Sequence, residues 1–300
     1  MPRHLTVSHT TEYKYSEPVA FGRHRMMFRP RDSHSMRLLN TQLSIIPRPL
    51  RISWAYDVFG NSVAYAEFGS VRSSILAFHS EITILHYEQT DLTSLLSDAA
   101  KTFPFSYPDQ ELSDIRPVME LRFPDPQHIL KSWAEKFVDD SRHVTLSLLT
   151  SMAESIRSDF TYRGRPKSGT QSPIETLELR SGTCRDFAVL MIEALRSIGI
   201  AARFVSGYLF SAGRVPRRGA GSTHAWVQVY LPGCGWFEID PTNGIFGNRD
   251  LIRIAVATNP AQALPLSGTF VGNPGYFLGM EVSVNVVENK NKTAAVDRGA

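Results

Sequence analysis

The hydrophobic pattern of this 300-residue chain changes its period near residue 127, and no other feature constrains the fold as strongly. Before that point apolar and polar residues alternate over short runs, which is typical of half-buried strands. Six runs show this alternation: 5–15, 25–29, 38–46, 51–59, 62–68 and 75–87. Gly60-Asn61 is suited to a tight turn between the fourth and fifth runs. No helical period separates the runs, so residues 1–90 predict a small antiparallel β domain.

Five prolines interrupt the segment from 91 to 126. Because a residue before a proline disfavours helix, this segment is interpreted as a linker with one helical turn near 92–100. Beyond it, apolar residues recur every three or four positions, which predicts helices at about 127–139, 145–160, 173–180 and 184–199. Strands are then predicted at about 201–209, 223–231, 235–240, 250–257 and 280–288.

These elements predict an α+β protein in four parts. The antiparallel β domain covers residues 1–90, and the proline-rich linker covers 91–126. A core over 127–288 has a helix that begins at Cys184 and packs on an antiparallel sheet. Residues 289–300 are expected to form a flexible polar tail.

Composition places the chain among soluble globular proteins. Hydrophobic residues make up 42% and charged residues 20%, and the formal net charge is only +3. These values exclude a fibrous or disordered chain, and they do not demand nucleic acid as a partner. No apolar run reaches about 18 residues, so we expect no membrane-spanning helix. The first residues lack the apolar stretch of a secretory signal, which predicts a cytoplasmic protein whose two cysteines stay reduced.

One of the two cysteines occupies a position that activates thiols. Thr183 and Asp186 form an N-terminal capping pattern just before an apolar run, which places Cys184 in the first turn of a helix. The helix dipole and the unpaired backbone N–H groups there favour an anion and lower the pKa of a thiol. The alternative is a small buried residue that seals the helix end, and this motif alone does not separate the two.

A histidine and an aspartate are predicted at the same end of a hairpin. His224 begins a strand in which Trp226, Gln228 and Tyr230 share its face, and this polar, aromatic face is suited to line a cleft. The return strand ends at Asp240, which antiparallel pairing brings back towards His224. A carboxylate there would hold the second N–H of the imidazole. The alternatives are an incidental surface histidine and an aspartate that caps a turn.

Four segments together resemble the transglutaminase-like superfamily, and more closely its bacterial branch of predicted cysteine proteases. They are Gly182–Phe187, Ala202–Tyr208, His224–Trp226 and Gly235–Thr242. The resemblance covers roughly residues 130–260, and the β-rich beginning is similar to the N-terminal domain of that branch. It implies a transglutaminase- or papain-like core over 127–288.

The resemblance also implies roles for three residues. Cys184 would be the nucleophile, His224 the base and Asp240 the carboxylate that orients the imidazole. Family members commonly carry glutamine directly after the cysteine and histidine five positions after it, whereas this chain has Arg185 and Val189 there. These departures bear on the identity of the substrate more than on the triad.

Two function classes remain open. The first is a cysteine-dependent amide-bond hydrolase (a protease or peptidase) or an acyltransferase, acting on a peptide or protein amide through a thioester. The second is a non-catalytic peptide-binding or scaffold protein that keeps the core, an alternative motivated by Arg185 and Val189. Nucleic-acid binding through the arginines between 23 and 31 rests only on one charged strand, so we expect no nucleic-acid partner.

Other residues carry weaker signals. Tyr162 is a candidate second oxyanion donor, and Cys234 lies in a glycine-flanked turn without help from a helix dipole. The segment 211–221 is interpreted as a solvated loop, with contact to an acidic substrate as the alternative. The sequence contains neither metal-ligand spacing nor a dinucleotide fingerprint, so we expect no metal and no cofactor.

Overall fold

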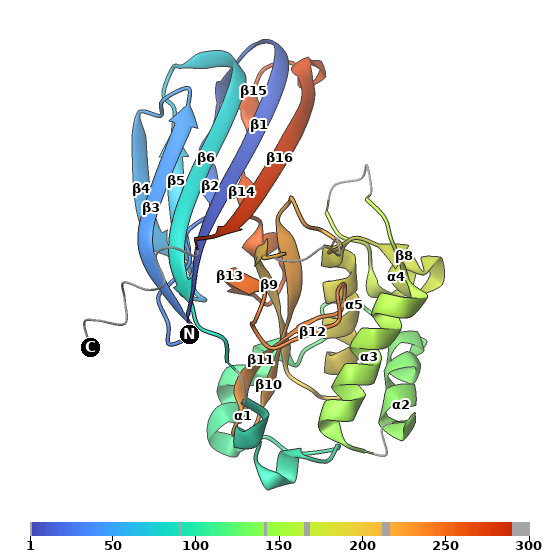
Figure 1. The fold of residues 1–300 in the computed structure, drawn as a ribbon. Helices are drawn as coiled ribbons and strands as arrows, with labels where there is room; N and C mark the ends of the chain where they lie inside the picture. Colours follow the sequence, from blue (N-terminus) through green and yellow to red (C-terminus); the bar gives the residue numbers. More distant parts are fainter. Residues whose placement is uncertain (1, 90–91, 141–142, 165–168, 212–216, 290–300) are drawn as a thin grey trace, which may run out of the picture.

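The computed structural model describes residues 2–89, 92–140, 143–164, 169–211 and 217–289. A β domain built from both ends of the chain stands over a core of helices and a second region of sheet (Figure 1). The predicted α+β class is confirmed. Among the described residues, none of the helices has the length and apolar character needed to cross a bilayer.

Two antiparallel sheets form the β domain. The larger has the order β15-β1-β6-β3, and β16 also pairs with β1. Its strands are β1 (Arg3–Phe21), β3 (Met36–Ile46), β6 (Arg72–His86), β15 (Phe270–Val271) and β16 (Phe277–Glu288). The smaller has the order β14-β2-β5-β4, with β2 (His24–Met26), β4 (Arg51–Tyr56), β5 (Ser62–Glu67) and β14 (Leu266–Ser267). Each of the six predicted strand runs of the first ninety residues contributes a strand to these sheets, although β2 and β4 end three residues before the predicted ends at 29 and 59.

The last strand of the chain belongs to the β domain, which corrects the predicted core over 127–288. β16 pairs with β1 from Leu5 opposite Glu288 to Tyr15 opposite Phe277. The alternation of Val282, Val284 and Val286 predicts a strand, but it does not indicate which sheet that strand joins. β1 is bonded to β6 along its other side, so β16 supplies the partners that the free edge of β1 requires.

The linker contains more helix than one turn near 92–100. The 3₁₀ segments η1 (Leu92–Leu95) and η2 (Asp98–Ala100) occupy that region, and α1 (Asp109–Ile115) with η3 (Arg116–Val118) follows. Tyr107 fastens the linker to the core, because its hydroxyl donates to the Tyr230 carbonyl at 3.0 Å and accepts from the Ala201 N–H at 2.8 Å.

In the core, helices cover one face of a five-stranded antiparallel sheet (Figure 1). The helices are α2 (Ile129–Asp140), α3 (Thr145–Asp159), α4 (Pro173–Leu179) and α5 (Cys184–Ser197), each within about two residues of its predicted bounds. The sheet order is β12-β11-β10-β9-β13. Its strands are β9 (Ala202–Leu209), β10 (His224–Leu231), β11 (Gly235–Asp240), β12 (Ile245–Phe246) and β13 (Leu251–Ala257). A short parallel pair, β7 (Thr161–Tyr162) and β8 (Ser181–Gly182), joins the end of α3 to the start of α5.

Helix α5 is the central element of the core. Its side chains Val189 and Leu190 pack in one apolar cluster with Ala225 and Val227 of β10. This packing follows from the predicted apolar stripe of the helix and fixes α5 against the sheet. The first residue of α5 is therefore held in a fixed position relative to the sheet.

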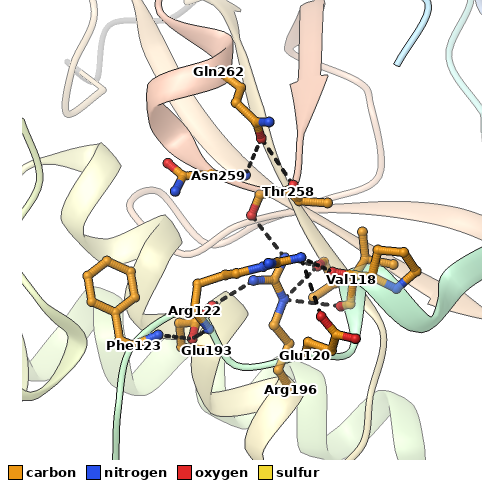
Figure 2. A network of polar contacts seen from close by, with 11 residues as sticks. Val118, Glu120, Arg122, Phe123, Glu193, Arg196, Thr258, Asn259 and Gln262 are labelled. Atoms are coloured by element: carbon orange, nitrogen blue, oxygen red, sulfur yellow. Dashed lines mark hydrogen bonds and ion pairs between the residues drawn. The ribbon is translucent and has the colours of Figure 1, made fainter. Parts of the chain in front are cut away.

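A buried ion pair holds the C-terminal end of α5 (Figure 2). Arg196 Nη1 donates to Glu193 Oε1 at 2.6 Å, and both side chains are almost inaccessible to solvent. Arg196 also donates to the carbonyls of Val118 and Thr258, and Glu193 accepts the Arg122 backbone N–H at 2.7 Å. The pair therefore ties α5 to the linker on one side and to the end of β13 on the other.

Candidate active site

Cys184 is the first residue of α5, as the capping pattern predicts. Asp186 Oδ2 accepts the Thr183 N–H at 2.8 Å, and the Thr183 hydroxyl oxygen accepts the Asp186 N–H at 3.5 Å. Gly182 is needed just before this cap, because an added Cβ would lie 2.8 Å from the Asp186 Cβ. The capping interpretation of Asp186 is confirmed, and Cys184 stands at the N-terminal end of the helix with 6% of its surface exposed.

The hairpin of β10 and β11 brings His224 and Asp240 together. Their pairing register puts Ile239 opposite Val227, so Asp240, the next residue, lies opposite Trp226 and two positions from His224. His224 Nε2 and Asp240 Oδ2 are 2.8 Å apart, and both side chains are fully buried. Since an ionised carboxylate only accepts, Nε2 carries the proton of this hydrogen bond.

Two further donors fix the carboxylate of Asp240. The backbone N–H of Thr242 donates to Oδ1 at 2.9 Å, and Asn243 Nδ2 donates to Oδ2 at 2.9 Å. These bonds arise from the turn Pro241–Gly244, so the capping role and the bond to His224 coexist in one residue. Together with burial of the site, they hold the imidazole in a single orientation.

Three charged groups determine the protonation states in this site. Burial raises the pKa of Cys184, but the charge of His224, with a smaller contribution from Arg185, outweighs burial and leaves that pKa below its ordinary value. Burial lowers the pKa of His224, yet the negative charges of Asp240 and Cys184 raise it above its ordinary value. Burial raises the pKa of Asp240, but the charge of His224 and the hydrogen bonds from the turn outweigh burial and leave that pKa below its ordinary value. These directions favour a thiolate beside an imidazolium and a carboxylate.

The second ring nitrogen of His224 is left for the thiol. Nδ1 is buried, Nε2 bonds Asp240, and a side-chain hydrogen bond with Cys184 contributes to the raised pKa of His224. Gly219 lies directly over it, since an added Cβ there would be 2.8 Å from Nδ1 and 3.3 Å from the Tyr162 hydroxyl. Gly219 also has a φ of +82°, a conformation that L side chains rarely adopt. The loop before β10 therefore closes over the imidazole only because this residue is glycine.

Tyr162, which the sequence indicated only weakly as a second oxyanion donor, lies beside the thiol. It belongs to β7, which pairs with β8 and so approaches the start of α5. Burial raises the pKa of Tyr162, and the charge of Cys184 raises it further. A phenol with a raised pKa keeps its proton and can donate a hydrogen bond to a developing negative charge.

A cavity of about 690 Å³ opens at Cys184, and we call it the Cys184 cavity. From the core, Tyr162 and Arg185 line it. From the β domain, strands β1 and β16 contribute His9, Thr11, Tyr13, Met280 and Val282. The β domain is thus one wall of this cavity. Sequence patterns contain no signal for these wall residues, because the wall exists only when the two chain ends pair.

His9 fastens this wall to the core sheet. It is 2% exposed, and its Nδ1 lies 2.8 Å from the hydroxyl of Tyr208 on β9. Its Nε2 lies 2.9 Å from Thr11 Oγ1. Burial lowers the pKa of His9 to about 4, so the ring is neutral at neutral pH. Tyr208 of β9 is thereby one of the contacts between the two domains.

The expectation that Trp226 and Gln228 line a cleft with His224 is wrong. Both are fully buried, and Trp226 Nε1 and Gln228 Nε2 donate to Glu238 at 3.2 and 2.9 Å. β10 is a central strand covered on both faces, by α5 on one side and by residues that include Phe59 of the β domain on the other. Period-two alternation identifies a shared face but not whether another domain covers it.

The remaining sequence candidates stand apart from Cys184. Cys234 is buried, and burial raises the pKa of its thiol. In the loop 211–221, Arg217 pairs with Asp250, and Arg218 donates to the Arg157 carbonyl at 2.9 Å. Residues 212–216 of that loop, and 290–300 of the predicted tail, lie outside the described residues. Within the described part of the chain, no group of three or more His, Cys, Asp or Glu side chains is arranged to hold a metal.

Comparisons with known proteins agree with the motifs. The family model of the transglutaminase-like superfamily matches residues 131–241, a range that includes Cys184, His224 and Asp240. The model of the bacterial transglutaminase-like N-terminal region matches residues 5–84. The resemblance inferred from the sequence is therefore confirmed.

One relative and one solved structure are similar to this chain over more than nine tenths of its length. An uncharacterized protein of Mycobacterium tuberculosis is 29% identical over 303 residues, covering 94% of this chain and 91% of that protein. A protein-glutamine gamma-glutamyltransferase of Pseudomonas aeruginosa is 38% identical over 76 residues, which are 24% of this chain and 11% of that protein. The crystal structure of a candidate cysteine protease from Cytophaga hutchinsonii shares the fold, with a TM-score of 0.68, 19% identity and coverage of 96% and 92%.

Proposed function

Since the chain belongs to the transglutaminase-like superfamily, we propose that it is a cysteine-dependent enzyme that attacks the carbonyl of a peptide or protein amide through Cys184. Family and fold support a cysteine-based enzyme in general. The observation that carries the proposal is the buried 2.8 Å bond between His224 and Asp240 beside a thiol whose pKa is lowered. A thiol without that neighbour would be a weak nucleophile at neutral pH.

Acylation is the first half of the proposed reaction. The Cys184 sulfur, its proton already on His224, attacks the amide carbon and forms a C–S bond. The carbonyl oxygen becomes an anion. The backbone N–H of Cys184 has no acceptor within the helix, because it belongs to the first turn, and it is the proposed first donor to this anion. The Tyr162 hydroxyl beside the thiol is the proposed second donor. His224 then gives its proton to the amine as the C–N bond breaks, leaving a thioester.

Release of the acyl group is the second half. His224 Nδ1 takes a proton from water or from an acceptor amine, which attacks the thioester carbon and expels the Cys184 thiolate. Asp240 keeps Nε2 protonated and offsets the imidazolium charge throughout. Water makes the enzyme a hydrolase, such as a protease or peptidase, and an amine makes it an acyltransferase. Cytoplasmic location and a peptide or protein substrate remain part of the proposal.

A trapped acyl-enzyme tests this proposal. Native protein, Cys184→Ala and Cys234→Ala are incubated with a peptide-amide library, quenched in acid and digested for mass spectrometry. The proposal predicts an acyl mass on the peptide that contains Cys184 in native protein and Cys234→Ala. Cys184→Ala should release no product. Identical product profiles for native protein and Cys184→Ala would instead support the non-catalytic scaffold.

A further inference from the structure

A second cavity lies on the face of the core sheet turned away from α5. Its volume is about 540 Å³, and it shares no lining residue with the Cys184 cavity. One wall consists of the β-domain segments 31–35 and 59–61. The other consists of β11, β13 and Arg203 of β9. We call it the Arg203 cavity. Cavities of this size hold metabolite-sized ligands.

Three arginines line the Arg203 cavity. Arg203 and Arg253 come from the neighbouring strands β9 and β13, and Arg31 comes from the β domain. Asp32 is the one acidic side chain among its lining residues. With Glu238, which pairs with Arg253 behind the cavity wall, three arginines stand against two carboxylates, so the cavity keeps a net positive charge.

Each guanidinium is oriented by one hydrogen bond, and most of its N–H donors remain available to a ligand. Arg203 Nε donates to Gln228 Oε1 at 2.9 Å, and its guanidinium lies 3.8 Å from the centre of the Trp236 ring. Arg253 Nη1 donates to Glu238 at 3.3 Å. Arg31 Nη1 donates to the Gly60 carbonyl at 3.0 Å. An arginine has five N–H donors in a rigid fork, so these anchors orient the groups without exhausting them.

The carboxylate behind the arginines offsets only part of their charge, because Glu238 forms an ion pair with Arg253 at 3.3 Å. Glu238 already accepts hydrogen bonds from Trp226, Gln228 and Arg253. Burial followed by the charge of Arg253 lowers the pKa of Arg203 to about 9, which means that these two cations repel each other. An added anion would relieve that repulsion and accept the remaining donors.

We propose that the Arg203 cavity binds a small anion that carries phosphate or carboxylate groups. The anionic groups contact Arg31, Arg203 and Arg253, and the apolar floor made by Phe59 and Val256 accepts the remainder of the molecule. Because Arg31 belongs to the β domain and the other two arginines to the core, the ligand bridges the domains. This binding is independent of the reaction proposed at Cys184.

Calorimetric titration with two probes tests the proposal. Pyrophosphate represents phosphate ligands and citrate represents carboxylate ligands, each at constant ionic strength maintained with sodium chloride. We expect saturable one-to-one binding of at least one probe. The probe that binds identifies which of the two anion types the site takes. Absence of binding by both probes would overturn the proposal.

Matched variants locate the binding. Arg203→Gln and Arg31→Gln should each weaken it at least about tenfold, because each removes one charge-assisted anchor. Arg249→Gln is the control, since Arg249 is exposed and does not line the cavity. Arg31 is exposed, so its variant remains informative even where Arg203→Gln unfolds. Equal weakening by Arg31→Gln and Arg249→Gln would overturn the proposal. Alkylation of Cys184 should stay unchanged in Arg31→Gln, which separates this test from that of the proposed reaction.

Discussion

Replacing Asp240 with asparagine tests whether its charge keeps His224 and Cys184 ionised. The carboxylate accepts from His224, Thr242 and Asn243 at 2.8, 2.9 and 2.9 Å, and both of its oxygens are used. An asparagine in the same place has one oxygen and one NH₂ group. Whichever way it is turned, the NH₂ group faces a donor, so Asp240→Asn removes the charge and part of the hydrogen bonding.

The expected effect on the pKa values follows from Coulomb's law. Two opposite unit charges at about 4 Å attract by about 4 kcal/mol when the effective dielectric constant is about 20. One pKa unit corresponds to about 1.4 kcal/mol, so the His224 pKa should fall by up to about 3 units. A neutral His224 no longer stabilises the thiolate, and the pKa of Cys184 rises in turn.

The assay is the pH dependence of iodoacetamide alkylation of Cys184, followed by mass spectrometry from about pH 5 to about pH 9. In Asp240→Asn the midpoint should move upward by at least about one pH unit. Asp159→Asn is the control, because Asp159 is exposed at the end of α3 and bonds only nearby serines. Thermal melting establishes that each variant is folded. Superimposable profiles for native protein and Asp240→Asn would refute the reasoning.

Three further predictions concern stability. Thr183→Ala removes the cap shared with Asp186 and should cost about 1 kcal/mol, measured by urea unfolding; an unchanged midpoint would contradict it. Arg196→Met leaves the buried Glu193 without its ion pair and should cost about 3–5 kcal/mol, far more than an exposed Arg→Met change. The pKa of His9 is 6.5 in the unfolded chain and about 4 in the folded protein, so the folded protein loses stability as the pH falls from 6.5 towards 4. His9→Gln should reduce this fall by up to about 3 kcal/mol, and an unaltered pH dependence of unfolding would contradict the burial of a neutral ring.

Local patterns were sufficient for the elements that carry the candidate site. Thr183 and Asp186 define a helix start from four residues of sequence, and the hairpin that returns to Asp240 requires only a short antiparallel turn. These features depend on neighbours within about 20 positions along the chain. Capping predicts the helix start at Cys184, and alternation with turn chemistry predicts the hairpin that joins His224 to Asp240. That Cys184 meets this hairpin was expected only from the resemblance to the transglutaminase-like superfamily.

Contacts between distant segments could not be predicted. Met280 reaches the Cys184 cavity because β16 pairs with β1, two segments from opposite ends of the chain. The burial of Trp226 depends likewise on the β domain covering the far face of the core sheet. Alternation along one strand is the same whether solvent or a second domain faces that strand. The position of Met280 and the burial of Trp226 are therefore visible only in the folded structure.

The central claim is that the environment of Cys184 converts its thiol to a thiolate. The most direct measurement compares iodoacetamide alkylation of Cys184 and Cys234 in native protein at about pH 6.5, where an ordinary thiol is only about 1% ionised. The two residues are 6% and 9% exposed, so differential access does not favour Cys184. We predict that Cys184 reacts at least about ten times faster. Equal rates, or faster reaction at Cys234, would contradict the account.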